Sequence, residues 1–270
     1  VGTVTDVDVQ DSEDGTQYVM TVKQKDNQGG ESSKEVRFSK YTDDDKVVVN
    51  IDLTDSGGAG LPSQQYLALG SGFVVKYSVG VGTAGGGTVD GYSDLKARVI
   101  VKRGSTVISE FQDAEFVGVT AGQSYTFDAS PYLKDATAYT VQVEAQATYQ
   151  GGTLMKTATA KVTMVAMTLE TTYSVGNGLS DGGYRNDVNI PFTAKGTSGD
   201  KNIYYRVNGG QAFTLGLSAG SGVQQKNVTI PLTQMQEGTN VVEAYAQHEN
   251  SGVVSRVHYI CLLYTSPSPR

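Results

Sequence analysis

Apolar residues recur at every second position through most of this chain, and no other feature limits its fold as strongly. In the segment 136–145, for example, Tyr139, Val141 and Val143 alternate with smaller or polar residues. Successive side chains of a β-strand point to opposite faces, so a period of two indicates strands that bury one face. Turn-forming breaks rich in glycine, aspartate or asparagine recur about every ten residues, which is typical of β-sandwiches. We therefore predict an all-β chain.

The composition favours several small sandwiches over one thick enzyme core. The 270 residues include 33 glycines and no tryptophan, and only 38% of them are hydrophobic. A glycine-rich, moderately apolar chain suits domains with many turns. The only cysteine is Cys261, so we expect neither disulfides nor cysteine-ligated metal sites in residues 1–260. No run of about 18 apolar residues is present, and we expect no membrane-spanning helix.

The charge of the chain argues against nucleic acid as a partner. The formal net charge is −7. Proteins that bind nucleic acids need a surplus of lysine and arginine to neutralise phosphates. The nearest approach to a basic cluster is Lys96, Arg98, Lys102 and Arg103, and these residues lie in an alternating strand pattern. We expect neither a nucleic-acid nor a membrane partner.

Residues 1–54 are predicted to form a small β-hairpin module. Two alternating segments flank the turn-forming residues Asp26–Gly30, which gives a hairpin over 17–39. A lone hairpin is only marginally stable in water. The module therefore needs a neighbouring domain or other copies of the chain, and we predict that it associates as a homotrimer. Lys46–Leu53 is predicted as a further strand of the module, and 55–65, rich in Gly, Ser and Pro, as a linker.

Residues 66–167 are predicted to form the first immunoglobulin-like sandwich. Its strongest strand contains Tyr139, Val141 and Val143 on one face. This string resembles the sixth strand of fibronectin type III domains. In those domains a tyrosine two residues ahead of the inward valines forms a tyrosine corner. The resemblance implies that Tyr139 is such a corner.

Residues 168–260 are predicted to form a second sandwich of the same kind. Glu237–Ala246 parallels the strand of Tyr139, because each segment contains Val-Glu-Ala. Val241 stands where a corner tyrosine would be expected. We interpret the two units as divergent copies of one fibronectin-III-like or immunoglobulin-like sandwich, arranged in tandem.

The segment Gly80–Gly85 fits the pattern G-x-G-x-x-G after a strand. Dinucleotide binding also requires a helix that opens at the third glycine, because the helix N-terminus holds the pyrophosphate. Here more glycines and then a strand follow. We therefore interpret the segment as a mobile loop of the sandwich.

We predict no catalytic, cofactor-binding or metal-binding residues, and no enzyme activity. A zinc site needs three or four clustered ligands, whereas His248 and His258 have no third partner nearby, so both are expected at the surface. Asp11–Gly15 lacks the spacing of a calcium loop and is interpreted as a solvated turn. Asp43–Asp45 is interpreted as a bend. No G-x-S-x-G motif supports a catalytic serine.

The tyrosines are the one surface feature with a bearing on binding. Tyr204 and Tyr205 are adjacent in a predicted strand, so one of them must point outward. One outward tyrosine is ordinary, whereas a carbohydrate-binding module predicts a shallow groove lined by several. Asn227–Thr229 matches a glycosylation acceptor but lies in a predicted strand, and we interpret this match as chance.

The last ten residues, 261–270, resemble the in-frame translation of a transposase-based sequencing adapter. This resemblance implies that the natural part of this chain stops near Ile260, that the true C-terminus is missing and that Cys261 is not native. The chain also begins with Val1 rather than methionine. We therefore expect an internal fragment of a longer protein.

The order of hairpin 17–39, linker and sandwiches carrying Tyr66–Gly72 and Gly238–Tyr245 resembles the large tail-fibre or adsorption proteins of tailed phages of gut Bacteroidales. The resemblance implies a non-enzymatic stalk segment in a virion tail, trimeric, with a missing tip domain that binds a host surface glycan. Two alternatives stay open. One is a bacterial cell-surface adhesin or a spacer of a surface glycan-processing protein, and the other is a carbohydrate-binding module.

Overall fold

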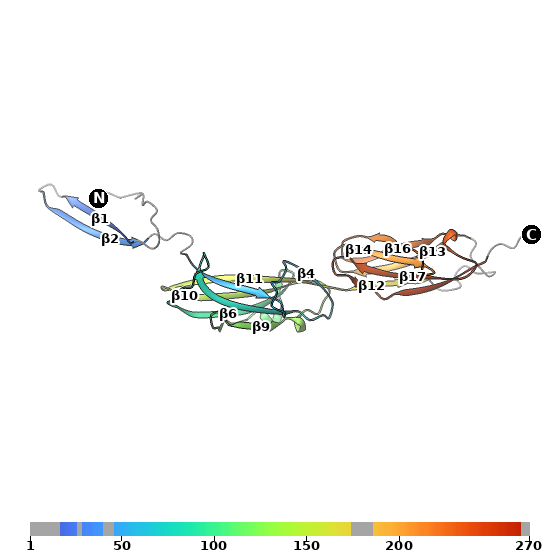
Figure 1. Ribbon diagram of the computed structural model, residues 1–270, viewed down its shortest axis with the longest axis horizontal. Helices are drawn as coiled ribbons and strands as arrows, with labels where there is room; N and C mark the ends of the chain where they lie inside the picture. The colour runs from blue at the N-terminus through green and yellow to red at the C-terminus, as the bar shows by residue number, and fades with distance from the viewer. Residues whose placement is uncertain (1–16, 26–28, 40–45, 174–185, 266–270) are drawn as a thin grey trace, which may run out of the picture.

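The computed structural model is almost entirely β-structure, as predicted. It describes residues 17–25, 29–39, 46–173 and 186–265. A hairpin of β1 (Gln17–Lys25) and β2 (Glu31–Ser39) precedes two immunoglobulin-like sandwiches that lie end to end (Figure 1). Helical residues in the described ranges form 3-10 turns, and no helix there is long and apolar enough to cross a membrane.

The first sandwich packs a three-stranded sheet, in the order β3-β5-β9, against a larger sheet in the order β4-β11-β10-β6-β7, with β8 also paired to β6. Its strands are β3 (Val47–Thr54), β4 (Gln65–Ala68), β5 (Val74–Thr83), β6 (Tyr92–Arg103), β7 (Thr106–Val107), β8 (Val117–Gly118), β9 (Ser124–Asp128), β10 (Ala138–Tyr149) and β11 (Gly152–Val165). Strand β4 runs parallel to β11, whereas the other pairs are antiparallel.

Strand β3 belongs to the first sandwich, contrary to the prediction that it is part of a separate module at 1–54. It pairs with β5 along its whole length. Val49 is only 2% exposed and packs in one core cluster with Val79 and Ala145. The period of two identified the strand, but a local pattern does not specify a partner strand that follows much later in the chain.

The predicted linker 55–65 is the crossover by which the chain passes from one sheet of this sandwich to the other. The carboxylate of Asp55 accepts hydrogen bonds from the backbone N–H groups of Gly57 and Ala59, at 2.8 and 2.9 Å. Leu61 packs against the core. This segment is therefore an ordered part of the first sandwich, although its composition is typical of a linker.

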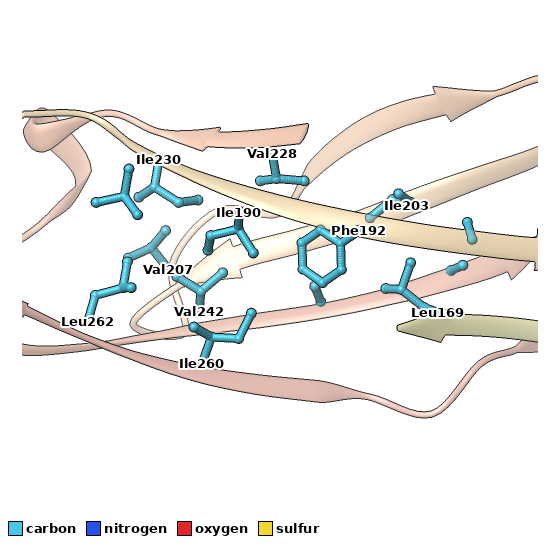
Figure 2. Packing of buried hydrophobic residues seen from close by; sticks show 14 of the residues in the cluster. Leu169, Ile190, Phe192, Ile203, Val207, Val228, Ile230, Val242, Ile260 and Leu262 are labelled. Carbon is cyan, nitrogen blue, oxygen red and sulfur yellow. The ribbon is translucent and has the colours of Figure 1, made fainter. Parts of the chain in front are cut away.

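The second sandwich packs the sheet β12-β13-β16 against the sheet β15-β14-β17-β18, in which β19 also pairs with β17. Its strands are β12 (Met167–Thr171), β13 (Val188–Gly196), β14 (Lys201–Val207), β15 (Phe213–Leu217), β16 (Gly222–Ile230), β17 (Gly238–His248), β18 (Val253–Val254) and β19 (His258–Tyr264). Inward side chains of the two sheets meet around Phe192, with Ile190 and Ile203 close by (Figure 2). Burying each such side chain contributes about 1.5–3 kcal/mol.

Strand β19 continues to Tyr264, four residues beyond the expected end of the natural sequence. Cys261 pairs with Val241 and is exposed, whereas Leu262 is 1% exposed and lies in the core (Figure 2). The tail extends the strand because Leu262 keeps the inward parity of Ile260. The adapter origin of these residues stays a prediction.

A matching hydrogen bond closes the turn before β10 in the first sandwich and before β17 in the second. The phenol oxygen of Tyr139 accepts a bond from the backbone N–H of Asp135 at 2.9 Å, which confirms the predicted tyrosine corner. In the second sandwich this role falls to Asn240, whose Oδ1 accepts from the backbone N–H of Gln236 at 2.9 Å. The sequence pattern placed the expected corner position at Val241, which points to the other face. Asn240 is not predictable from that pattern because it is a polar residue at an inward position.

Candidate functional site

Only one residue, Ala166, separates the last strand of the first sandwich from the first strand of the second. Its backbone is paired on both sides with Thr197, in the turn between β13 and β14. The Ala166 N–H donates to Thr197 Oγ1 at 3.0 Å, and the Ala166 carbonyl accepts from the Thr197 N–H at 3.1 Å. Val165 is buried in the core of the second sandwich. The connection is thus held by both domains.

The turn that contacts Ala166 is held in place by hydrogen bonds from the ammonium of Lys201. This residue is only 2% exposed. Its Nζ lies 2.7–3.1 Å from four backbone carbonyl oxygens, and because an ammonium has three N–H groups, at least one of them is shared between two carbonyls. The carbonyls belong to Thr197, Gly199, Ala219 and Gly220. The first two lie in the β13–β14 turn and the other two between β15 and β16, so one side chain ties the two loops together.

The protonation of Lys201 follows from its surroundings. Burial lowers the pKa of the Lys201 ammonium, and the nearby carboxylate of Asp200 opposes that change. The four carbonyl groups can only accept hydrogen bonds, so they favour the protonated amine. Hydrogen bonds to a charged donor are also stronger than those between neutral groups. Lys201 is therefore a protonated side chain held in place next to the connection at Ala166, which we call the joint.

His248 completes the joint from β17. It is fully buried, contrary to the prediction of a surface histidine, because its parity on the strand is inward. Its Nε2 lies 3.1 Å from the carbonyl of Ser198, and its ring centroid lies 5.6 Å from that of Tyr66 in the first sandwich. Gly199 passes beneath the ring at a φ of +130°, where a Cβ would come within 2.5 Å of Nε2. A side chain at 199 would displace the ring.

A second feature is shared by both sandwiches. Arg98 on β6 faces Glu144 on β10, and Arg206 on β14 faces Glu243 on β17. The closest nitrogen to oxygen distances are 2.7 and 2.6 Å. Glu144 and Glu243 are each the central residue of the repeated Val-Glu-Ala string. These ion pairs supply a common register for comparing the outer faces of the two domains.

In the second sandwich this ion pair is surrounded by outward tyrosines. A shallow hollow here is lined by these tyrosines and the ion pair, with Tyr205, Ala212 and Val257 beside them. We call five of its lining residues the tyrosine face: Tyr204, Arg206, Glu243, Tyr245 and Tyr259. Tyr204 pairs in register with Tyr245, and their rings are stacked with centroids 5.5 Å apart. Tyr259 lies opposite Glu243 and is 66% exposed. The hollow has a volume of about 280 Å³.

A carboxylate holds one end of the tyrosine face in place. Glu249 Oε1 accepts hydrogen bonds from the Tyr204 hydroxyl and from Asn202 Nδ2, both at 3.0 Å. The bond to Glu249 is the main reason that the pKa of Tyr204 is raised above 10.0. The hydrogen bond to Glu249 therefore fixes the hydroxyl end of Tyr204, and one face of its ring is stacked on Tyr245.

The equivalent surface of the first sandwich differs. By the shared register, Lys96, Gln146 and Thr157 take the positions of Tyr204, Tyr245 and Tyr259. That surface is also partly covered, because Phe116 lies against Arg98, whose guanidinium carbon is 4.5 Å from the ring centroid. The open cluster of tyrosines is thus a property of the second copy alone.

The structure brings together residues that sequence reasoning kept apart. One of the two adjacent tyrosines points outward, as predicted. The structure shows that it is Tyr204, while Tyr205 stacks on Phe213 and packs against the core. Yet Tyr204 is not a single outward tyrosine, because Tyr245 and Tyr259 share its face. The parity of Tyr245 was readable from its alternation with buried alanines. The position of Tyr259 depends on how β19 pairs with β17.

The other motifs lie as follows. Gly80 and Gly82 are in strand β5 rather than in a loop, and the backbone of Gly87 approaches Gly82 too closely for any side chain there. His258 is half-buried and contacts the carbonyl of Leu169 through Nε2. Within the described residues no group of three or more His, Cys, Asp or Glu is arranged to hold a metal ion. Asn227 lies in β16, as predicted.

The two acidic motifs that the sequence analysis singled out are not covered by this structure. Asp11–Gly15 and Asp43–Asp45 both lie outside the described residues.

No family model and no curated protein matches this chain. Among solved structures, it is similar to a tetra-tandem repeat from the extending region of a large adhesion protein, at 14% identity and a TM-score of 0.41 over 93% of this chain. This chain spans 57% of the length of that repeat structure. It is also similar to three N-terminal domains of the outer capsid protein Hoc of bacteriophage RB49, at 13% identity and a TM-score of 0.40, covering 96% of this chain and 92% of that one.

A third similar structure is a segment of titin, at 11% identity and a TM-score of 0.33, covering 93% of this chain and 75% of that one. These similarities are too low to transfer a function. The assignment of the fold rests on the strand pairing described above.

Proposed function

We propose that this chain is a non-enzymatic stalk segment of a larger attachment protein, which holds successive sandwiches in line so that a distal part is projected from a surface. The observation that carries the proposal is the joint at Ala166. Domains connected by several free residues reorient with respect to each other by default. Here the connecting residue is hydrogen-bonded on both sides to Thr197.

Two further contacts support a fixed joint. Tyr66 of the first sandwich packs against the core cluster and His248 of the second. The β13–β14 turn, which contacts Ala166, is linked by Lys201 to the loop between β15 and β16. A stalk made of such units transmits orientation from one domain to the next, which a string of independent domains does not do.

The setting that we favour is the tail fibre of a phage, with the chain assembled as a homotrimer through its N-terminal hairpin. The acidic charge of −7 is compatible with an exposed, soluble shaft and with no nucleic-acid partner. A bacterial cell-surface adhesin uses the same mechanical property. A signal peptide or anchoring domain in the full-length gene would favour the adhesin over the fibre.

Distance measurements between the two sandwiches test the stalk. Cys261 is replaced by serine, and spin labels are placed at Lys156→Cys on β11 and Gln225→Cys on β16, both exposed positions. The labelled chain is diluted with an excess of unlabelled chain, so that only the two labels within one chain are measured. Double electron–electron resonance should then give one narrow distance distribution.

Insertion of Gly-Ser-Gly-Ser after Ala166 is the control, and it should broaden this distribution. A distribution in the parent chain as broad as that of the insertion variant would overturn the proposal.

A further inference from the structure

We propose that the tyrosine face of the second sandwich is a binding site for a neutral saccharide. This goes beyond the stalk function, because it gives the shaft itself a lateral ligand site. The site lies on the outer surface of β14, β17 and β19, whereas the joint residues Lys201 and His248 are buried on β14 and β17.

The first argument is shape. Tyrosine rings present flat apolar surfaces with a polar hydroxyl at the rim. A pyranose ring is the complementary object, since it has C–H groups on its faces and hydroxyls around its edge. Tyr204 and Tyr245 are stacked with an angle of 20° between their planes, and Tyr259 is 66% exposed beside them. The hollow of about 280 Å³ suits one or two sugar units rather than a protein loop.

The second argument is the arrangement of hydrogen-bonding groups around the rings. The guanidinium of Arg206 has five N–H groups, and its Nε and one terminal nitrogen contact Glu243 Oε2 at 2.7 and 2.6 Å. This pairing fixes both side chains in the hollow. A fixed donor and a fixed carboxylate beside an aromatic surface are what adjacent sugar hydroxyls require. Glu249 and Asn202 add a second polar edge beyond Tyr204.

The third argument is charge. Among the described residues that line the hollow, Arg206 is the one cation, and it is paired with Glu243. The hollow therefore offers no unpaired positive charge to an anionic sugar, and the ligand is neutral. A protein partner fits less well, because a stable interface buries roughly 1,200 Å² or more and has an apolar centre. The hollow is small and is lined mainly by tyrosines and charged groups.

The fourth argument is the comparison between the two copies. Both sandwiches keep the ion pair, between β6 and β10 in the first and between β14 and β17 in the second. In both, a side-chain oxygen accepts from a backbone N–H four residues upstream. The first copy folds with Lys96, Gln146 and Thr157 at the three tyrosine positions. The sandwich fold therefore does not require tyrosines there, and a ligand explains why an exposed surface carries three.

The test uses the whole chain on an array of neutral oligosaccharides built from glucose, galactose, mannose and fucose, with sialylated and sulfated counterparts beside them. Neutral probes that bind are then titrated by calorimetry. Tyr259→Ala should weaken binding about tenfold or more, from the loss of one stacking surface. Tyr149→Ala, a half-exposed tyrosine on the first sandwich, is the matched control and should bind like the parent chain.

Three results would overturn the proposal: no binding to any neutral probe, a preference for the anionic probes, or equal affinity of the parent chain and Tyr259→Ala. Analytical ultracentrifugation adds a fourth. If Tyr259→Ala abolished self-association of the parent chain, the tyrosine face would be a contact between copies. The folding of each variant is checked by the amide NMR signals of β17.

Discussion

The side-chain oxygen of Asn240 accepts a hydrogen bond from the backbone N–H of Gln236, four residues upstream, at 2.9 Å. Tyr139 closes the same four-residue span onto Asp135 in the first sandwich. Asn240 does more, since its Nδ2 also donates to the carbonyls of Gln236 and Gly238. Two different side chains therefore close the equivalent turn in the two sandwiches, and the buried amide of Asn240 does so with more hydrogen bonds than the phenol of Tyr139.

This difference predicts an order of stability losses. Tyr139→Phe removes one hydrogen bond at a partly buried turn and should lower the free energy of unfolding by about 1 kcal/mol. Asn240→Ala removes a fully buried amide with several partners and should cost about 2–4 kcal/mol. Native-state hydrogen exchange at β10 and β17 measures each domain separately. A smaller loss for Asn240→Ala than for Tyr139→Phe would contradict the role assigned to Asn240.

Lys201 makes a second prediction, about the joint. Lys201→Met keeps much of the side-chain volume but leaves four carbonyls without their donor, and it should destabilise the second sandwich by about 3 kcal/mol. Because the freed β13–β14 turn contacts Ala166 through Thr197, the distance distribution between the spin labels at 156 and 225 should also broaden. Lys195→Met, on the exposed side of β13, is the control. An unchanged distribution in Lys201→Met would show that the joint does not depend on this ammonium.

The raised pKa of Tyr204 predicts a pH dependence. The hydrogen bond to Glu249 favours the protonated phenol in the folded state, so the folded pKa lies above the ordinary value of 10.0. The corresponding stability is present below pH 10 and is lost as the pH rises through the folded pKa. NMR of ¹³C-labelled tyrosine should show Tyr204 ionising later than an exposed tyrosine, and Glu249→Gln should bring its pKa back toward 10. No difference between the two proteins would remove Glu249 as the cause.

The sequence predicted those features of the structure that depend on a pattern within one strand, and it did not predict those that depend on pairing between distant strands. Alternation identified the strands and the two sandwiches, because the period of two is local. It placed Tyr139 correctly, since a tyrosine ahead of inward valines is also a local pattern. The parity of His248 with the buried Ala244 and Ala246 was equally readable, but the expectation that a histidine belongs at the surface outweighed it.

The candidate sites were less predictable, because they depend on pairing between distant strands. Nothing near Tyr259 specifies that it lies across from Glu243, and nothing near Val49 specifies β5 as its neighbour. The carbonyl cage of Lys201 is made by backbone groups of two loops, and backbone groups leave no signature in a sequence. A lysine at an inward strand position was the one available hint.

Because β3 belongs to the first sandwich, a truncation that tests self-association must keep β3. We predict that the full chain is a trimer through the hairpin β1–β2, because two strands alone bury too little surface to be stable. Light scattering should give a trimer for residues 1–270 and a monomer for 46–270, which keeps the whole first sandwich. A truncation at 66 would instead remove β3 with its buried Val49 and expose the core. If 46–270 remained a trimer the hairpin would not be the contact, and a monomeric full chain would refute the trimer itself.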